Sequence, residues 1–287
     1  MDNATVAVFA PAKINLYLHV TGRRADGYHE LESLVVFADV GDRIMATADD
    51  GLSLEITGPQ SSELSAAADN LVLRAAEALR ARVGGGLGAR ITLEKNLPVS
   101  SGIGGGSADA AAAIKALSRL WHIHPAQHDL SGLALDLGAD VPVCLAGRTA
   151  LMSGIGEQLT FVELPTALPA VMVNPGVAIS TPAVFKARRG AFSDIGDMGT
   201  VPEGIAEIAA MLSASHNDLE APAMELAPGV GTVLVALNAV EDCLLARMSG
   251  SGATCFGIFA DESAASMAAA TLRSLHPDWW IADTVLG

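Results

Sequence analysis

The chain has 287 residues, of which 51% are hydrophobic and 17% charged, so it can bury a large core and does not belong to the disordered class. Its 32 acidic and 17 basic residues leave a formal charge of -15, which argues against nucleic acid or an anionic membrane as a partner, because both need a basic face. Residues 1–148 carry 17 acids and 12 bases, whereas residues 149–287 carry 15 acids and 5 bases. This asymmetry predicts two differently built halves.

Hydropathy and cysteine usage indicate in which cellular compartment the protein is expected. The mean hydropathy is +0.40, but the longest uncharged stretch, residues 164–185, contains four prolines and cannot form one regular spanning helix. Cys144, Cys243 and Cys255 are far apart and odd in number, which fits a reducing compartment and shows no metal spacing. The first residues lack a basic region followed by an apolar core, so we expect a cytoplasmic protein without a signal peptide.

The first half alternates strand and helix patterns. Strands are expected at residues 31–40, 43–47, 52–57 and 90–94, with Gly41 and Asp42 as the turn between the first two. A helix capped by Asp69 or Asn70 is expected to run to about Arg82. An alanine-rich helix over residues 108–121 and another over residues 130–137 follow.

The second half continues the mixture. Strands are expected near residues 149–152, 158–162, 170–174, 178–180 and 253–259, and helices near residues 202–213, 230–237 and 264–275. Because the elements mix without regular βαβ repeats, the sequence predicts an α+β fold of mixed β-sheet packed with helices. We expect two domains, residues 1–157 and 158–287.

The strongest motif is LPVSSGIGGGSAD, residues 97–109, where Gly102, Gly104, Gly105 and Gly106 directly precede a predicted helix. Glycines let backbone N–H groups approach an anion closely, and the helix adds its positive end. The loop is not a Walker A motif, since no lysine follows the glycines, and its spacing is a poor dinucleotide fingerprint. It predicts a phosphate-binding loop in which Ser107 caps the helix or ligates a metal, and an ordinary flexible turn is the alternative.

Three further motifs carry polar groups suited to a site. In PAKINLYL, Lys13 and Asn15 point to one strand face among apolar residues, where a lysine needs an anionic partner unless it lies at a solvated edge. In DGYHEL, Tyr28 offers a flat face for stacking and His29 a donor or acceptor, although such a segment is more often a surface turn. In LGADVP, Asp140 is either a helix cap or a carboxylate that acts as a base on a hydroxyl.

The glycines of MSGSGATCF, residues 248–256, form a fourth motif. A tight loop is the default interpretation, and a backbone approach to a ligand is the alternative. Taken in order, these motifs resemble the GHMP family of small-molecule kinases over nearly the whole chain, with LPVSSGIGGGSADAAAAI similar to its ATP loop. The pair DGYHEL and LGADVP is similar to the branch that acts on a cytidine diphosphate-linked methylerythritol in non-mevalonate isoprenoid precursor biosynthesis.

The resemblance implies a two-domain GHMP kinase fold that transfers a phosphoryl group from ATP to the 2-hydroxyl of that substrate, with Mg²⁺ as cofactor, as a monomer or homodimer. Asp140 would accept the hydroxyl proton or mainly position the hydroxyl, and Lys13 would stabilise charge at the reacting centre. Substrate would contact Asn15, Tyr28, His29 and Phe185, with Phe185 and Tyr28 stacking around the cytosine. The ATP phosphates would be held by Pro98, Val99, Ser100, Ser101, Gly102, Ile103, Gly104, Gly105, Gly106, Ser107 and Ala108.

One position departs from the family pattern: Ala108 stands where a second serine often follows the glycines, which leaves Ser107 as the hydroxyl near Mg²⁺. Residues 190–216 match no motif. Another GHMP kinase, acting on homoserine, mevalonate or a sugar, is the alternative function, because it would keep the ATP loop without needing Tyr28 and Phe185. A non-catalytic nucleotide-binding regulator is a third possibility, against which the presence of Lys13, Asp140 and Ser107 argues.

Overall fold

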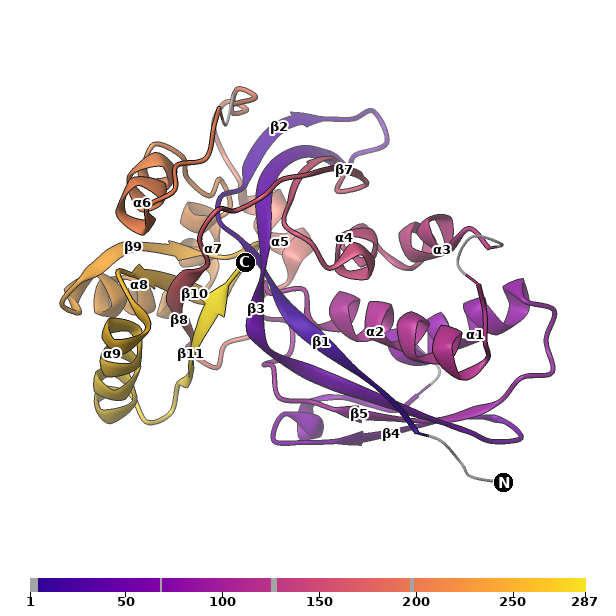
Figure 1. Cartoon of the computed structure of the whole chain (residues 1–287). Helices are drawn as coiled ribbons and strands as arrows, with labels where there is room; N and C mark the ends of the chain where they lie inside the picture. Colours follow the sequence, from indigo (N-terminus) through magenta and orange to yellow (C-terminus); the bar gives the residue numbers. More distant parts are fainter. Residues whose placement is uncertain (1–4, 68, 125–127, 197–198) are drawn as a thin grey trace. The chain divides into compact units, whose positions relative to one another are not determined.

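The computed structural model describes residues 5–67, 69–124, 128–196 and 199–287 (Figure 1). The chain forms two compact units. The first comprises Met1–Ala12, Gly41–Val99 and Gly104–Gly147, and the second comprises Lys13–Val40, Ser100–Ile103 and Arg148–Gly287. The long strands β1 (Val6–Asn15) and β3 (His29–Ala48) contribute residues to both units, so this division is interleaved in sequence and differs from a single boundary at residue 157.

The first unit is built on a small mixed sheet. Strand β4 (Leu52–Thr57) runs parallel to β5 (Ala89–Glu94), and β5 pairs antiparallel with the second part of β3, from Arg43 opposite Glu94 to Ala48 opposite Ala89. Helix α1 (Leu71–Arg82) packs on β4, and α2 (Gly105–Leu120) packs on β5 and along α1 (Figure 1). A short 3-10 turn, η1 (Ser61–Glu63), follows β4.

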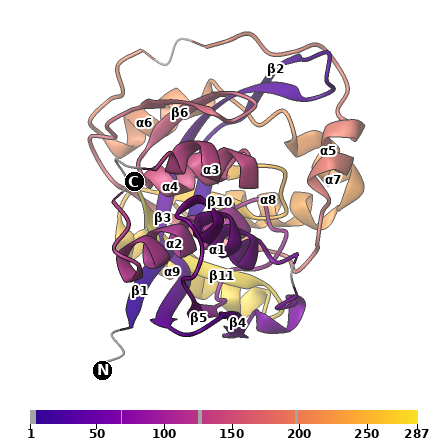
Figure 2. The ribbon, with the colours of Figure 1, turned by 90° about the vertical axis from the view of Figure 1, so that its right-hand side faces the viewer.

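Helix α2 is the centre of this unit. Helix α4 (Val141–Ala146) packs on it, and α3 (Leu130–Leu137) packs on α4 and α1, as the view in Figure 2 shows. Its alanines are buried almost all round, and such small side chains let the neighbouring helices approach closely. The same small residues supply the helix propensity that the alanine-rich pattern predicted.

Strand β3 corrects one expectation. A turn was expected at Gly41 and Asp42. Strand β3 instead continues through both residues and is 20 residues long. A Cβ on Gly41 would lie 2.3 Å from the carbonyl oxygen of Ala10 in β1, so the glycine permits a close approach of two strands and does not make a turn. Asp42 is fully buried, and its partners are described below.

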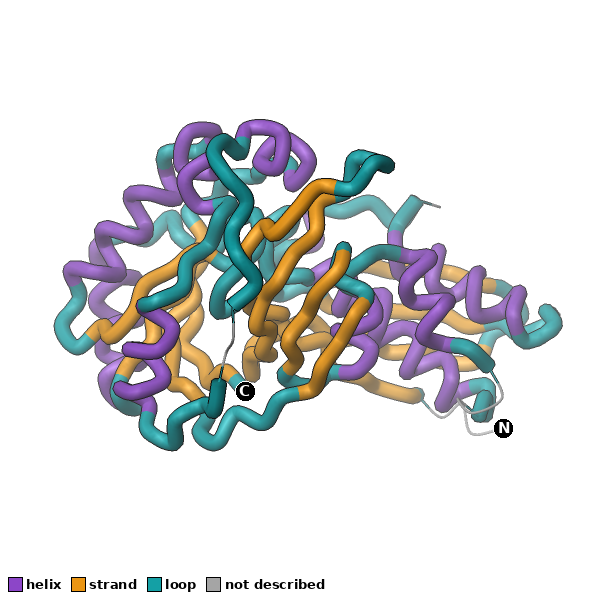
Figure 3. Tube along the Cα trace, turned by 90° about the horizontal axis from the view of Figure 1, so that it is seen from above, coloured by secondary structure: helices purple, strands orange, loops and turns teal. Residues whose placement is uncertain are grey.

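The second unit contains a four-stranded antiparallel set of strands. Strand β8 (Leu168–Asn174) pairs with β10 (Cys255–Phe259) and with β11 (Trp280–Leu286), and β10 also pairs with β9 (Cys243–Met248). Helices α8 (Gly229–Ala239) and α9 (Glu262–Leu275) pack on these strands (Figure 3). The apolar core between them includes Val171, Val173, Phe259, Val233, Leu237, Ala268 and Leu272.

The rest of the second unit is a set of shorter elements. Strand β2 (His19–Arg23) forms a hairpin with β3, β6 (Ala150–Gly154) pairs with β3, and β7 (Gln158–Phe161) pairs with β6. Three helices complete it: α5 (Thr181–Ala187), α6 (Ile205–Ser213) and α7 (Glu220–Leu226). The strand expected at residues 178–180 does not form, because the chain enters α5, whose first turn contains Pro182.

The expected α+β class is confirmed by this mixture of sheets and helices. Elements without an expectation from sequence include β2, α4, α5, α7, β9 and β11. Within the described part of the chain, no helix combines the length and apolarity needed to cross a bilayer.

Candidate active site

The start of α2, where the glycine motif lies, belongs to the first unit from Gly104 onward. The helix begins at Gly105, three residues earlier than expected, with Gly104 as its N-cap at a φ of +63°. Because Gly104 has no side chain, the first N–H groups of α2 have no side-chain cap, and Ser107 lies inside the first turn instead of capping it. A Cβ on Gly106 would meet open space. An uncapped helix N-terminus flanked by glycines is suited to bind phosphate.

The preceding residues of the motif, Ser100–Ile103, belong to the second unit and are held by two other motifs. The N–H of Lys13 donates to the carbonyl oxygen of Ile103 at 2.9 Å, and the N–H of Thr254 donates to that of Ser101 at 3.0 Å. The side chain of Lys13 is buried. The structure thus brings the lysine motif, part of the glycine loop and the second glycine loop together.

The glycines at this junction are required by close backbone contacts. Gly102 has a φ of +77°, and a Cβ there would lie 2.6 Å from the backbone nitrogen of Gly252 and from the carbonyl oxygen of Ser249. A Cβ on Gly250 would in turn lie 2.5 Å from the carbonyl oxygen of Gly102. The second glycine loop therefore serves to pack against the first, which neither of its two sequence interpretations stated.

Asn15 carries a polar atom that no described residue satisfies. Its backbone N–H donates to the Ser249 hydroxyl at 3.0 Å, and its side-chain amide donates to the Ser33 hydroxyl at 2.7 Å. That hydroxyl donates onward to the carbonyl oxygen of Tyr17, which fixes the amide orientation because Ser33 must accept from Asn15. The side-chain oxygen of Asn15 is buried without a hydrogen-bond partner, as expected of an atom that accepts a hydrogen bond from a ligand.

A buried ion cluster lies under the start of α2 in the first unit. The ammonium of Lys95 donates to Asp42 at 2.5 Å and to Asp109 at 2.7 Å, and all three side chains are at most 3% exposed. The other oxygen of Asp42 accepts from the backbone N–H groups of Asn96 and Leu97. The cluster therefore joins β3, the end of β5 and the first turns of α2.

Electrostatics in this cluster are unbalanced, since one ammonium faces two carboxylates. Burial raises the pKa of Asp109 to about 7, with Lys95 opposing the rise and Asp42 adding to it. Burial lowers the pKa of Lys95, but the two carboxylates outweigh it and raise it overall. No motif pointed to this cluster, because Asp42 was assigned to a turn and Lys95 and Asp109 resembled ordinary strand-end and helix residues.

Asp140 lies in the first unit, directly before α4, and is half-buried. It occupies the N-cap position, but its side chain makes no capping hydrogen bond. Capping α4 is therefore not the role of this carboxylate. Asp140 and Lys13 belong to different units.

The aromatic residues expected around a base lie in the second unit. Tyr28 is exposed in the turn between β2 and β3, and His29 is the first residue of β3. The His29 ring stacks on Phe185 of α5, with centroids 4.9 Å apart and an angle of 22°. Burial, together with Arg23 and Arg188, lowers the pKa of His29, so its imidazole is neutral at pH 7.

Within the described residues, no group of three His, Cys, Asp or Glu side chains is arranged to hold a metal ion. Cys144, Cys243 and Cys255 are free cysteines. Any metal at the glycine loop would therefore depend on few protein ligands and on the bound phosphates.

Comparison with known proteins identifies both halves of the chain. The model described as GHMP kinases N terminal domain matches residues 70–148, and GHMP kinases C terminal matches residues 177–278. A 4-diphosphocytidyl-2-C-methyl-D-erythritol kinase of Cereibacter sphaeroides is 57% identical over 279 residues, which cover 96% of each chain. A relative of the same name from Paramagnetospirillum magneticum is 52% identical over 282 residues, with 98% of each chain covered.

Solved structures agree with these matches. The crystal structure of a 4-(cytidine 5'-diphospho)-2C-methyl-D-erythritol kinase has a TM-score of 0.79 and 36% identity, covering 98% of this chain and 99% of that one. A homoserine kinase from Cytophaga hutchinsonii, at 19% identity and a TM-score of 0.74, covers 99% of this chain and 96% of its own, and shares the fold. With both family domains matched in order and relatives of this identity over nearly the full length, the chain belongs to the GHMP kinase family of small-molecule phosphotransferases.

Proposed function

We propose that the chain transfers the γ-phosphoryl group of ATP to the 2-hydroxyl of 4-diphosphocytidyl-2-C-methyl-D-erythritol, in the cytoplasm, for isoprenoid precursor synthesis. The observation that supports it most is that Tyr28 and Phe185, the pair expected around the cytosine, lie in one unit, with the His29 ring stacked on Phe185, in a chain that also has the uncapped glycine loop. An aromatic pair offers flat surfaces for a nucleobase. The names of the relatives at 52–57% identity favour the same substrate over homoserine, mevalonate or a sugar.

The glycine loop supplies the ATP-binding part of this proposal. The N–H groups at the start of α2 would bind phosphate oxygens with little side-chain charge. Binding through backbone N–H groups suits a chain of net charge -15, in which acidic side chains outnumber basic ones. Residues 98–108 would together surround the phosphates.

Magnesium fits the same place. Mg²⁺ bound with a nucleotide keeps waters and phosphate oxygens and takes only one or two protein ligands, so the absence of a three-residue cluster among the described residues is compatible with it. Ser107, half-buried in the first turn of α2, is the residue that would hold it. When bound, the ion would neutralise charge on the phosphates.

The remaining residues would act on the acceptor hydroxyl. Asn15 would accept a hydrogen bond from substrate through its unpartnered side-chain oxygen. Asp140 would orient the 2-hydroxyl and accept its proton, and Lys13 would stabilise the charge that develops as the phosphoryl group transfers.

A coupled ADP-release assay tests the proposal. With ATP and Mg²⁺, ADP should form when the cytidine substrate is present and not with homoserine, mevalonate or a sugar. Comparable kcat/KM on an alcohol without cytidine would establish the alternative kinase, and tight ATP binding without transfer to any alcohol would establish a regulator. The same sample on gel filtration distinguishes monomer from homodimer.

Asp140→Asn separates chemistry from binding. The variant should bind ATP as the wild type does but lose turnover by about 100- to 10,000-fold, because general acid–base catalysis contributes that range. Asp136→Asn is the matched control, since Asp136 is an exposed carboxylate of neighbouring α3. Wild-type turnover in Asp140→Asn would remove Asp140 from the mechanism.

A further inference from the structure

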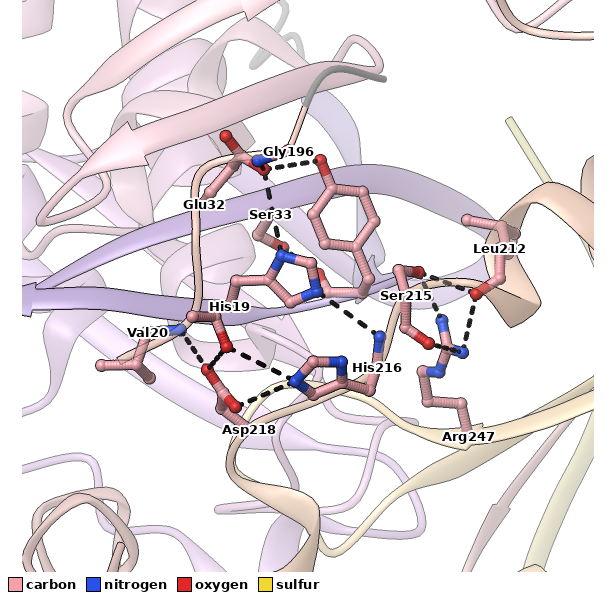
Figure 4. Close-up of polar contacts among 12 residues, drawn as sticks. His19, Val20, Glu32, Ser33, Gly196, Leu212, Ser215, His216, Asp218 and Arg247 are labelled. Carbon is pink, nitrogen blue, oxygen red and sulfur yellow. Dashed lines mark hydrogen bonds and ion pairs between the residues drawn. The ribbon is translucent and has the colours of Figure 1, made fainter. Parts of the chain in front are cut away.

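A polar cluster in the second unit centres on Asp218 (Figure 4). One carboxylate oxygen of Asp218 accepts hydrogen bonds from the N–H of Val20 at 2.6 Å and from the Ser193 hydroxyl at 2.8 Å. The guanidinium of Arg188 lies 3.6 Å from the same oxygen, and His216 Nε2 lies 3.1 Å from the other. One carboxylate thus connects the start of the β2–β3 hairpin with the segment that follows α5.

Asp218 is charged where it lies. Burial would raise its pKa, but the hydrogen bonds from Val20 and Ser193 and the charge of Arg188 and His216 hold the pKa of Asp218 below its usual range. The Asp218 side chain is only 12% exposed and that of Arg188 only 7%. Hydrogen bonds to a carboxylate in such a place are shorter and about twice as strong as neutral ones.

The two segments that Asp218 connects each carry a ring of the proposed base site. Val20 lies in β2 opposite Leu31 of β3, in the hairpin whose β3 strand begins with His29. Arg188 is the C-cap of α5, three residues beyond Phe185. The His29 ring, stacked on Phe185, therefore joins the same two elements that this carboxylate connects.

Segment 188–196, part of the stretch that matched no motif, lies along the hairpin and is anchored along its length. The Ser193 N–H donates to the carbonyl oxygen of Val20 at 3.0 Å, and the Gly196 N–H donates to Glu32 of β3 at 3.0 Å, as Figure 4 shows. Glu32 is buried at 3% exposure. The segment is therefore a fixed support for the hairpin.

Asp218 is itself held rigidly. Its backbone N–H donates to the carbonyl oxygen of Leu18 at 2.9 Å. Leu212 and Ser215 lie just before Asp218 in the chain. Their carbonyl oxygens accept hydrogen bonds from the buried guanidinium of Arg247 at 2.9 and 2.7 Å (Figure 4). A carboxylate whose own backbone is held by hydrogen bonds can position the groups that it binds.

We propose that Asp218 is a positioning residue for recognition of the nucleobase: by binding Val20, Ser193 and Arg188 together, it sets the distance between the β2–β3 hairpin and α5. This inference rests on the proposed function, in which Tyr28 of the hairpin and Phe185 of α5 flank a cytosine and His29 stacks on Phe185. Asp218 touches neither ring, so it acts through the elements that carry them.

The test is Asp218→Asn, assayed with the cytidine substrate and ATP varied separately. Asparagine keeps the size and one acceptor oxygen but loses the charge that binds Arg188 and the second acceptor. We expect the KM for the cytidine substrate to rise about tenfold, the order of one charged hydrogen bond, while kcat and the KM for ATP stay within about twofold. Asp194→Asn, an exposed carboxylate of the same segment, should match the wild type.

Ser193→Ala gives a milder second variant, since it removes one hydrogen bond to Asp218. It should raise the same KM about threefold and decides the question if Asp218→Asn does not fold. An unchanged KM for the cytidine substrate, or an equal rise in both KM values, would overturn the positioning role. If the wild type itself fails to phosphorylate the cytidine substrate, the proposed function fails first, which keeps the two failures distinct.

Discussion

Replacing Lys95 by methionine isolates the buried ion cluster beneath the glycine loop. Methionine fills a similar volume but removes the ammonium that binds Asp42 and Asp109. Asp42 keeps two backbone N–H donors, from Asn96 and Leu97. Asp109 keeps none of its charge compensation, because Lys95 is the cation that binds it and its other oxygen is buried without a hydrogen-bond partner.

The expected loss follows from this arrangement. Breaking a buried ion pair by removing one partner costs about 3–5 kcal/mol, because an uncompensated charge is left behind. That is a large part of the 5–15 kcal/mol by which native proteins are stable. Lys95→Met should therefore lower the free energy of unfolding by about 4 kcal/mol at pH 8.

The loss should depend on pH with a definite sign. The pKa of Asp109 is raised from 3.8 to about 7 in the native protein, so above pH 4 the native state binds more protons than the unfolded state. Its contribution to stability therefore falls as pH rises from about 4 to 7. Without Lys95, which opposes the rise, the fall continues above pH 7, so the variant should be more damaged at pH 8 than at pH 6.

Urea unfolding of wild type and variant at pH 6 and pH 8 measures this. Adding Asp109→Asn to Lys95→Met should recover part of the loss at pH 8, because it removes the uncompensated carboxylate. Lys115→Met is the matched control, since the half-buried Lys115 donates to the backbone carbonyl oxygen of Cys144 and not to a buried carboxylate. A Lys95→Met protein within about 1 kcal/mol of wild type at both pH values would refute the reasoning.

Three further outcomes follow from the same structure. Gly106→Ala should stabilise α2 by about 0.5–1 kcal/mol, since a Cβ there meets open space, yet raise the KM for ATP by obstructing phosphate; a lower melting temperature or an unchanged KM for ATP would contradict this. Gly102→Ala should destabilise the protein by about 1–3 kcal/mol in urea unfolding, because of its positive φ and the close atoms of Gly252 and Ser249, and a neutral result would count against the loop contact. Burial raises the pKa of Cys243 to about 11, so iodoacetamide at pH 8 should alkylate it about 100-fold more slowly than a free cysteine, and a comparable rate would show that the thiol is not buried.

Local signals predicted some elements well. Helix α1 was expected because Asn70 offers a cap and apolar residues recur at helical spacing, and Asn70 does accept from the N–H of Val72. Strands β9 and β11 were missed because their residues are mostly half-buried and show little alternation. Their stability comes from pairing with β10 and β8, which lie elsewhere in the chain.

The candidate site divides in the same way. The glycine motif is short and contiguous, and so is the DGYHEL motif that carries Tyr28 and His29. The residue types of each motif therefore indicate its chemistry. Segment 188–196 carries no motif, because its role depends on backbone groups that meet Asp218 and Glu32. Pairing of that kind leaves no pattern in a single sequence.

The sequence by itself determined the fold class, the net charge of -15 and the run of glycines directly before a helix, because each follows from residue types in one stretch or from overall composition. Only the tertiary structure decided that Gly41 is a place of close strand approach and that Asp42 joins Lys95 and Asp109 in a buried cluster. Asp42 lies 53 residues from Lys95 in the chain. A buried charge survives only with its partner beside it, and that partnership exists only once the strands and α2 have packed.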